Sequence, residues 1–228
     1  MKNFGKDERI FAMSCRYLFF DLDGTLSDSA EGILNAVCYA LEKMKFPVPD
    51  RSELTHFIGP PLVRTFAQDY DLSPAEAQRA VDTYREYYMV RGKYECRMYH
   101  GIEELLEGAK NAGYRMAVAT CKPTVTARDV IRHFGIDSYF DLLSGPELDG
   151  TRNEKEEVIA YAMQELGIRD PAEVLMIGDR RDDVIGAAKN GIDCAGVLWG
   201  FGSEKELLDA GAKYIFGTPA ELLRHLAE

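Results

Sequence analysis

The sequence has few cysteines, and their spacing fits neither a disulfide framework nor a metal site. There are five in 228 residues, an odd number, and no two of them form a Cys-x-x-Cys pair. This excludes the disulfide-rich scaffolds and the structural zinc sites that pair cysteines at short spacing. We expect reduced thiols at all five positions, which are Cys15, Cys38, Cys96, Cys121 and Cys194.

Long apolar runs are also missing. The longest, such as residues 17–20 and 116–119, are far shorter than the roughly 20 residues that a membrane-spanning helix needs. The first 15 residues carry charges in every turn and lack the apolar stretch of a secretory signal. We therefore expect a cytoplasmic protein without membrane partners, with residues 1–14 as a peripheral extension.

Basic residues are outnumbered by acidic ones. The 27 Lys and Arg residues face 38 Asp and Glu residues, so the formal net charge is -11. A chain of this charge is repelled by phosphate backbones and anionic lipid. We expect no nucleic-acid partner, and instead a monomer or weak homodimer that acts on a small molecule.

What the chain does contain is a regular alternation of short apolar runs with segments of helical periodicity. The runs predict buried strands, and several of the segments between them end at a glycine, which is favoured in left-handed helix caps. The pattern predicts an α/β fold with a Rossmann-like parallel sheet covered on both faces. The predicted strands are 16–20, 114–120, 142–144, 173–178, 193–198 and, as an edge, 213–216; the predicted helices are 102–112, 125–134, 154–166, 184–190, 204–210 and 220–226.

Residues 30–98 interrupt this alternation. Their apolar residues recur only at helical spacing, and the strand-helix rhythm resumes near Gly101. We predict an all-helical cap domain over 30–98, inserted into an α/β core domain made of 15–29 and 99–228. Such an insert can close over a site at the strand ends.

Two acidic residues directly follow the first predicted strand. Asp21 and Asp23 belong to the run Asp-Leu-Asp-Gly-Thr-Leu, at the strand end where ligands bind in parallel sheets. A polar turn bent at Gly24 would explain the Asp-Gly pair but not the other acid. The functional interpretation therefore needs partners at the ends of later strands.

Such partners are present, although each has an ordinary explanation. Thr120 ends the second predicted strand, where its hydroxyl could hold a phosphoryl oxygen or simply terminate the strand. Asp179 and Asp183 follow the fourth, in Gly-Asp-Arg-Arg-Asp-Asp, which would also fit a solvated loop. Lys155 lies near the start of a predicted helix, where lysines are ordinarily at the surface.

Taken in order and in strand context, these positions resemble the four signatures of the haloacid dehalogenase superfamily. The resemblance covers about residues 16–228. The first signature, Asp-x-Asp-Gly-Thr-Leu-x-Asp-Ser, matches residues 21–29, and the last, Gly-Asp-x-x-x-Asp, matches 178–183. Thr120 corresponds to the second signature and Lys155 to the third. Taken singly, only the first and last signatures are specific for this superfamily. The four signatures in this order are specific as a set.

The resemblance implies a reaction and a metal. Asp21 would be the nucleophile that attacks phosphorus and forms an aspartyl-phosphate, and Asp23 the general acid and base. A carboxylate that attacks a phosphate dianion needs a divalent cation, and Mg²⁺ suits an all-oxygen site. Its ligands would be Asp21, the backbone carbonyl of Asp23 and the Asp179 carboxylate, with Asp183 orienting a water or Lys155.

The residues that adjoin the first two signatures are candidates for contact with the substrate. Thr120 and Lys155 would stabilise charge on the transferring group. Gly24, Cys121 and Lys122 join Thr120 as candidate substrate-binding residues. Cys121 has no base partner and is expected to fill space. Lys122 could approach the phosphate, although we favour solvation for it.

The helical insert resembles the small cap of phosphoglycolate phosphatase-like members, which supplies substrate contacts. Arg64, just after the loop 57–62, is a candidate substrate-binding residue, although the rigid Pro-Pro helix start explains this loop equally well. Related sugar-phosphate mutases often have Arg three residues after the loop glycine. This chain has Leu62 there, which argues against a mutase.

The segments 148–155 and 191–202 resemble a bacterial subgroup of phosphoglycolate phosphatases and 5'-nucleotidases. We predict a Mg²⁺-dependent phosphatase that hydrolyses phosphoglycolate or a nucleoside 5'-monophosphate. One alternative is a phosphomutase or phosphotransferase. Another is a non-catalytic protein that binds phosphorylated ligands. The dehalogenases of this superfamily lack an acid at the position that corresponds to Asp23, so the resemblance argues against dehalogenation. Trp199 and Phe201 are expected to pack against the sheet rather than stack on a base.

Overall fold

A six-stranded parallel sheet forms the centre of the molecule. The computed structural model describes residues 15–227, so the predicted extension 1–14 lies outside the described residues. The strand order is β5-β4-β1-β6-β7-β8, and every neighbouring pair is parallel. The predicted α/β, Rossmann-like class is confirmed. The strands are β1 (Tyr17–Phe20), β4 (Arg115–Ala119), β5 (Leu142–Ser144), β6 (Val174–Gly178), β7 (Asp193–Val197) and β8 (Tyr214–Phe216).

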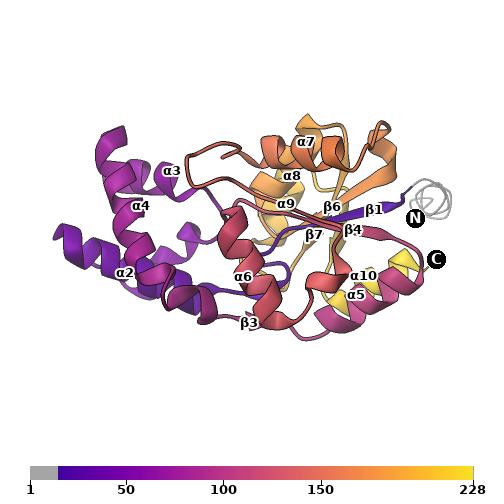
Figure 1. Cartoon of the computed structure of the whole chain (residues 1–228), viewed down its shortest axis with the longest axis horizontal. Helices are drawn as coiled ribbons and strands as arrows, with labels where there is room; N and C mark the ends of the chain where they lie inside the picture. The colour runs from indigo at the N-terminus through magenta and orange to yellow at the C-terminus, as the bar shows by residue number, and fades with distance from the viewer. Residues whose placement is uncertain (1–14, 228) are drawn as a thin grey trace.

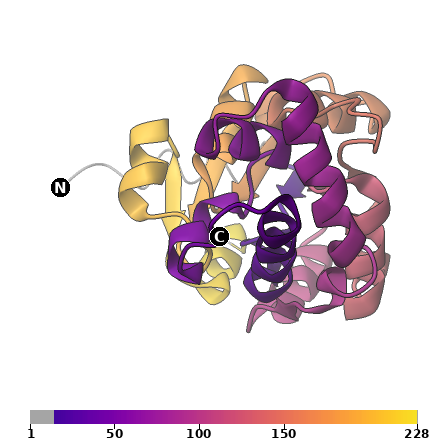
Figure 2. The ribbon, with the colours of Figure 1, turned by 90° about the vertical axis from the view of Figure 1, so that its left-hand side faces the viewer.

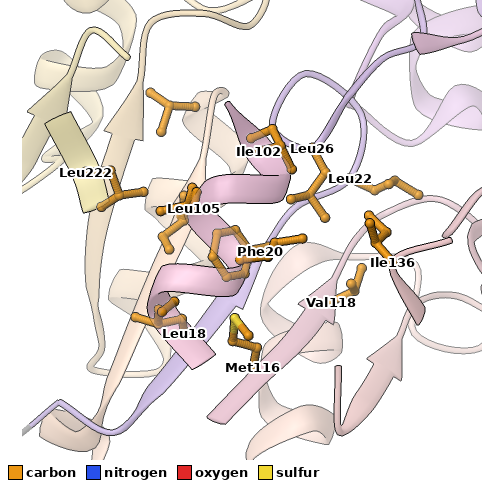
Figure 3. Close-up of a cluster of buried hydrophobic side chains, with 14 of the residues drawn as sticks. Leu18, Phe20, Leu22, Leu26, Ile102, Leu105, Met116, Val118, Ile136 and Leu222 are labelled. Atoms are coloured by element: carbon orange, nitrogen blue, oxygen red, sulfur yellow. The ribbon is translucent and has the colours of Figure 1, made fainter. Parts of the chain in front are cut away.

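Helices cover both faces of this sheet (Figure 1). Because side chains alternate along a strand, Leu18 and Phe20 of β1 pack on one face while Phe19 packs on the other. Figure 3 shows the first of these two clusters, with Leu105 and Leu222 from the covering helices. The first face carries α5 (Ile102–Asn111), α6 (Thr124–Phe134) and α10 (Pro219–Leu226), and the second carries α7 (Lys155–Glu165), α8 (Arg181–Lys189) and α9 (Glu204–Ala210).

Most predicted helix bounds agree with the structure to within a residue, but α8 begins three residues before the predicted start at Val184. Asp182 and Asp183 lie in its first turn, where negative charge is stabilised by the partial positive charge of the helix N-terminus. A charge cluster of this kind is typical of a loop, so the sequence predicts a helix start that is three residues too late.

The segment of residues 30–98, which we call the cap segment, has a hydrophobic cluster of its own. Helix α2 (Ala30–Met44) packs along α4 (Pro74–Tyr88); α2 contributes Leu34, Val37 and Leu41 to this cluster, and α3 (Leu62–Asp69) contributes Phe66. Figure 2 shows the cap segment facing the viewer, in front of the sheet. Its elements are α2 (Ala30–Met44), η1 (Arg51–Phe57), α3 (Leu62–Asp69), α4 (Pro74–Tyr88) and η2 (Gly92–Tyr94). The division into two domains stays a prediction.

A short two-stranded ribbon joins the cap segment to the sheet. Strand β2 (Ser27–Asp28) pairs antiparallel with β3 (Arg97–Met98). The sequence predicted helices throughout 30–98, and at residues 97–98 that prediction is wrong. A strand of two residues has no detectable periodicity, and it forms here because the ends of the cap segment meet. The remaining short elements are η3 (Asp137–Tyr139) and η4 (Pro171–Glu173).

Among the helices in residues 15–227, none combines the length and the apolar character required to cross a membrane.

Candidate active site

The candidate catalytic residues meet where three neighbouring strands end. Strands β4, β1 and β6 are adjacent, and Thr120, Asp21 and Asp179 each follow the last residue of one of them. The backbone N–H of Asp21 donates to the carbonyl of Ile177 at 2.9 Å, which continues the β1-β6 pairing by one more residue. All three side chains are buried. Parallel pairing therefore brings together residues that lie up to 158 positions apart in the sequence.

Lys155 is at the centre of this group. Its Nζ lies 3.0 Å from Oδ1 of Asp21 and 2.7 Å from Oδ1 of Asp183, and it donates to the carbonyl of Ala119 at 3.0 Å. Lys155 is only 4% exposed, so the ordinary expectation of a surface lysine is wrong. Burial lowers the pKa of Lys155, but Asp183 and Asp21 raise it well above its usual value. The lysine is therefore a fixed positive charge between two carboxylates.

Asp179 and Asp183 are held by specific hydrogen bonds. Asp179 accepts from the Thr25 hydroxyl at 3.2 Å and from the backbone N–H of Phe201 at 2.8 Å. Asp183 accepts from the backbone N–H of Arg180 at 3.0 Å. Both carboxylates are essentially inaccessible to solvent, so the alternative of a solvated loop is wrong.

Three carboxylates are close enough together to share a cation. In residues 15–227, ligand oxygens of Asp21, Asp179 and Asp183 lie within 4.8 Å of one another. Desolvation raises the pKa of Asp21 to about 6, against the attraction of Lys155, and it raises that of Asp179 well above its usual value. Three buried carboxylates face one lysine, so this centre has excess negative charge. An oxygen-only donor set of this kind fits Mg²⁺.

Asp23 is paired with a residue for which the sequence analysis favoured a different environment. Lys122 places its Nζ 2.8 Å and 2.7 Å from the two carboxylate oxygens of Asp23 and 4.8 Å from the centre of the Tyr88 ring. Lys122 is 7% exposed, so the favoured solvation of this side chain is wrong. Its backbone N–H donates to the Thr120 hydroxyl at 3.2 Å, in a tight turn that returns the side chain to the site. The sequence signal that could have indicated this buried position is that Lys122 follows Thr120 by two residues.

Two further candidates have steric roles. Gly24 has a φ of +86°, and a Cβ built there would lie 2.2 Å from Oδ2 of Asp179, so only glycine leaves space for that carboxylate. Cys121 is half-buried at the site, and desolvation raises the pKa of its thiol to about 12. A neutral thiol is a poor nucleophile, which agrees with the expectation that Cys121 fills space.

A cleft lies between the cap segment and the strand ends, and we call it the cap cleft. Asp23, Cys121 and Lys122 form part of its wall, opposite residues of η1, α3 and α4. It encloses about 860 Å³ when the open space at its mouth is included. A substrate in the cap cleft would therefore reach Asp23 directly.

Arg64 is not among the residues that line the cap cleft. Its guanidinium lies 2.6 Å from Asp182 of α8 and 3.3 Å from Glu154, which precedes α7. Its role as a substrate ligand stays a prediction, and the observed contacts join the cap segment to α8 and to the residue before α7. Trp199 donates its indole N–H to the Thr25 carbonyl at 2.9 Å and packs on the core as expected, whereas Phe201 packs on the cap segment's cluster.

Comparison with known families and sequences identifies relatives over most of the chain. The model of the haloacid dehalogenase-like hydrolase family matches residues 18–197. A protein of Pseudomonas aeruginosa named 5'-nucleotidase is 48% identical over 190 residues, which is 83% of this chain and 86% of that protein. A Mycobacterium tuberculosis protein named tyrosine-protein kinase PtkA is 42% identical over 214 residues, covering 94% of this chain and 70% of that protein.

Comparison with solved structures also identifies a similar protein over most of the chain. The crystal structure of a predicted phosphatase from Clostridium acetobutylicum superposes with a TM-score of 0.91 at 46% sequence identity. The superposition covers 93% of this chain and 98% of that protein. The agreement therefore extends over both the sheet and the cap segment.

Proposed function

The chain belongs to the haloacid dehalogenase-like hydrolases and is an enzyme of the phosphatase type, and on this basis we propose that it hydrolyses a small phosphomonoester with Mg²⁺. The candidate substrates are phosphoglycolate and nucleoside 5'-monophosphates. One observation carries the proposal. A buried carboxylate, Asp21, is held by Lys155 at 3.0 Å, while a second carboxylate, Asp23, lies in the wall of the cap cleft.

Asp21 is the proposed nucleophile. One of its oxygens attacks phosphorus, the bond from phosphorus to the leaving oxygen breaks, and an aspartyl-phosphate forms. Lys155 and the Thr120 hydroxyl stabilise the charge on the transferring phosphoryl group. Because Lys155 is fixed by Asp183 and the Ala119 carbonyl, its charge is already in position before the substrate arrives.

Asp23 is the proposed acid and base. It gives a proton to the leaving alcohol, then takes one from the water that attacks the aspartyl-phosphate and releases inorganic phosphate. Lys122 holds both oxygens of Asp23 in the free protein, so we infer that it also positions this carboxylate. Asp21 and Asp179, with the backbone carbonyl of Asp23, would hold Mg²⁺, and the bound cation would offset the repulsion between Asp21 and the phosphate dianion.

The test is phosphate release from a panel that includes phosphoglycolate, 5'-AMP, 5'-UMP, pyrophosphate, sugar phosphates and p-nitrophenyl phosphate. Release should require Mg²⁺, stop with EDTA and fall at least about a thousandfold in Asp21→Asn. Asp71→Asn, an exposed aspartate of the cap segment, is the matched control and should keep full activity. Release that persists in Asp21→Asn would overturn the assignment of the nucleophile.

A phosphotransferase is the second candidate, because one relative that matches 94% of the chain is named a tyrosine-protein kinase. The same aspartyl-phosphate would then pass its phosphoryl group to an alcohol or phenol instead of water. Labelled phosphate found on an added acceptor, with little free phosphate, would favour this alternative.

A further inference from the structure

Two tyrosines of the cap segment line the cap cleft next to the candidate acid and base. Tyr84 and Tyr88 are one turn apart on α4, and their rings stack with centroids 5.0 Å apart and an interplanar angle of 19°. Lys122, which holds Asp23, lies over the ring of Tyr88, 4.8 Å from its centre. Because both rings extend from the same face of α4, their hydroxyls lie in the same part of the cap cleft.

The hydroxyls of Tyr84 and Tyr88 have no hydrogen-bond partner within the described residues 15–227. Each tyrosine is only 5% exposed, and a buried hydroxyl without a partner is unfavourable, so such groups are usually paired. In the same part of the chain, neither oxygen is among the fully enclosed polar atoms that lack a partner, so each is in contact with open space. The cap cleft is that space, because both residues line it.

Both hydroxyls keep their protons. Burial raises the pKa of each phenol well above its usual value, and the negative charge of Asp23 adds to the increase. Each hydroxyl can therefore donate one hydrogen bond and accept another. The charged side chains that line the cleft already have ion-pair partners, such as Asp23 for Lys122 and Arg152 for Glu147. The two hydroxyls are thus neutral polar groups that are free to bind a molecule in the cleft.

We propose that Tyr84 and Tyr88 determine substrate specificity by forming hydrogen bonds to a neutral oxygen of the leaving group, such as a hydroxyl or a carbonyl. This inference rests on the proposed function. Asp23 would contact the leaving oxygen, and Lys122 joins Asp23 to Tyr88, so an oxygen a few bonds beyond the leaving oxygen would reach the two hydroxyls. A substrate without such an oxygen would displace water from both hydroxyls and leave them unpaired, which is unfavourable.

The first test uses two pairs of substrates of equal size, in which a methyl group replaces a terminal hydroxyl. The pairs are 2-hydroxyethyl phosphate with propyl phosphate, and 3-hydroxypropyl phosphate with butyl phosphate. In the parent, kcat/KM should favour the hydroxylated member of at least one pair by about tenfold or more. The double variant Tyr84→Phe, Tyr88→Phe should lose this preference. A double variant that slows all four substrates equally would overturn the inference, because the hydroxyls would then act on the phosphate or on water.

Binding separates this inference from the proposed function. Calorimetry of the same compounds with Asp21→Asn, with and without the two tyrosine substitutions, needs no turnover. If no compound is hydrolysed but the hydroxylated members bind more tightly through the tyrosines, the proposed function fails and the inference stands. If phosphate is released but neither assay shows a preference for the hydroxylated members, the inference fails and the hydrolase stands.

A third tyrosine provides the matched control. Tyr114 donates its hydroxyl to the carbonyl of Leu226 at 3.1 Å and is not among the residues that line the cap cleft. Tyr114→Phe should lower the melting temperature, because it removes this hydrogen bond, and should keep the substrate preference. The double variant keeps both rings and loses no hydrogen bond, so its melting temperature should not fall. A fall as large as that of Tyr114→Phe would reveal a structural role for the two hydroxyls and contradict the proposal.

Discussion

Several charged side chains of this site are buried. Asp21, Asp179, Asp183 and Lys155 are each less than 5% exposed, although charged side chains are seldom buried unless they are paired. Lys155 contacts two of the three carboxylates, and each of the three accepts a hydrogen bond from a backbone N–H group. Removing one member should therefore affect both folding and chemistry.

Lys155→Met is expected to lower the free energy of unfolding by about 3 kcal/mol near pH 8 in EDTA, because it leaves Asp21 and Asp183 buried without their counter-ion. Urea unfolding measures this loss, and phosphate release should also fall at least about a hundredfold. Lys189→Met, which removes an exposed lysine paired with Glu156, is the control and should unfold close to the parent. Equal unfolding midpoints for both variants would contradict the prediction.

Gly24→Ala is expected to impair metal binding. Its φ of +86° costs about 1 kcal/mol for alanine, and the added Cβ would force Asp179 to move. Titration of activity with Mg²⁺ should give a half-saturating concentration at least about tenfold higher. Gly113→Ala has a similar φ of +91° with nothing within 4 Å, so it should lose stability but keep its Mg²⁺ response. Identical Mg²⁺ curves would count against this role for Gly24.

At the scale of secondary-structure elements, ion pairs connect the cap segment to the helices that carry the site. Arg64 of α3 pairs with Asp182 of α8, which directly precedes the site residue Asp183. On the other side of the cleft, Lys93 of η2 lies 2.6 Å from Asp129 of α6. The chain enters and leaves the cap segment at the paired strands β2 and β3. These contacts add to those that Lys122 makes with Tyr88 and that Phe201 makes with the cap segment's cluster.

Arg64→Gln is expected to loosen α3 without unfolding the protein. Partly exposed ion pairs contribute no more than about 1 kcal/mol, so global stability should change little. Amide hydrogen exchange in α3 should become faster, and the difference from the parent should shrink at high salt, where the ion pairs are screened. Arg79→Gln, at an exposed arginine of α4, provides the charge-matched control. Unchanged exchange in α3 would show that these pairs do not hold the cap segment.

At the scale of the whole molecule, stability and metal binding are linked through the protons on the site. The folded state raises the pKa of Asp21 to about 6 from an ordinary 3.8, mainly by desolvation, and it also raises that of Asp179. Between about pH 4 and pH 6 these two carboxyl groups therefore hold more protons in the folded state than in the unfolded state. Their contribution to stability then falls as the pH rises through this window.

The melting temperature in EDTA is therefore expected to fall between about pH 4 and pH 6, with a loss of up to about 3 kcal/mol from Asp21. Asp21→Asn should flatten this slope because it removes the titrating group. Added Mg²⁺ should oppose the fall, since the metal binds the ionised carboxylates and its affinity increases with pH. A metal-free melting temperature that rises through this window would contradict the assigned pKa shifts.

Much of the molecule was determined by the sequence itself. Largely apolar runs of three to seven residues between helical segments predicted all six strands of the sheet, because strands buried on both faces are rich in apolar residues. The acids after β1 and β6 marked the strand ends, and glycines such as Gly113 and Gly135 marked helix ends where φ is positive. These signals are local, so they can be detected without knowing the fold.

Only the tertiary structure decided which charges pair. Lys122 contacts Asp23 across 99 positions, and Arg64 contacts Asp182 across 118, so no local pattern contains either pair. The ribbon β2-β3 likewise exists only because the two ends of the cap segment meet. The strength and partners of a charge depend on burial and on what lies across space, and both are fixed when the sheet and the cap segment pack together.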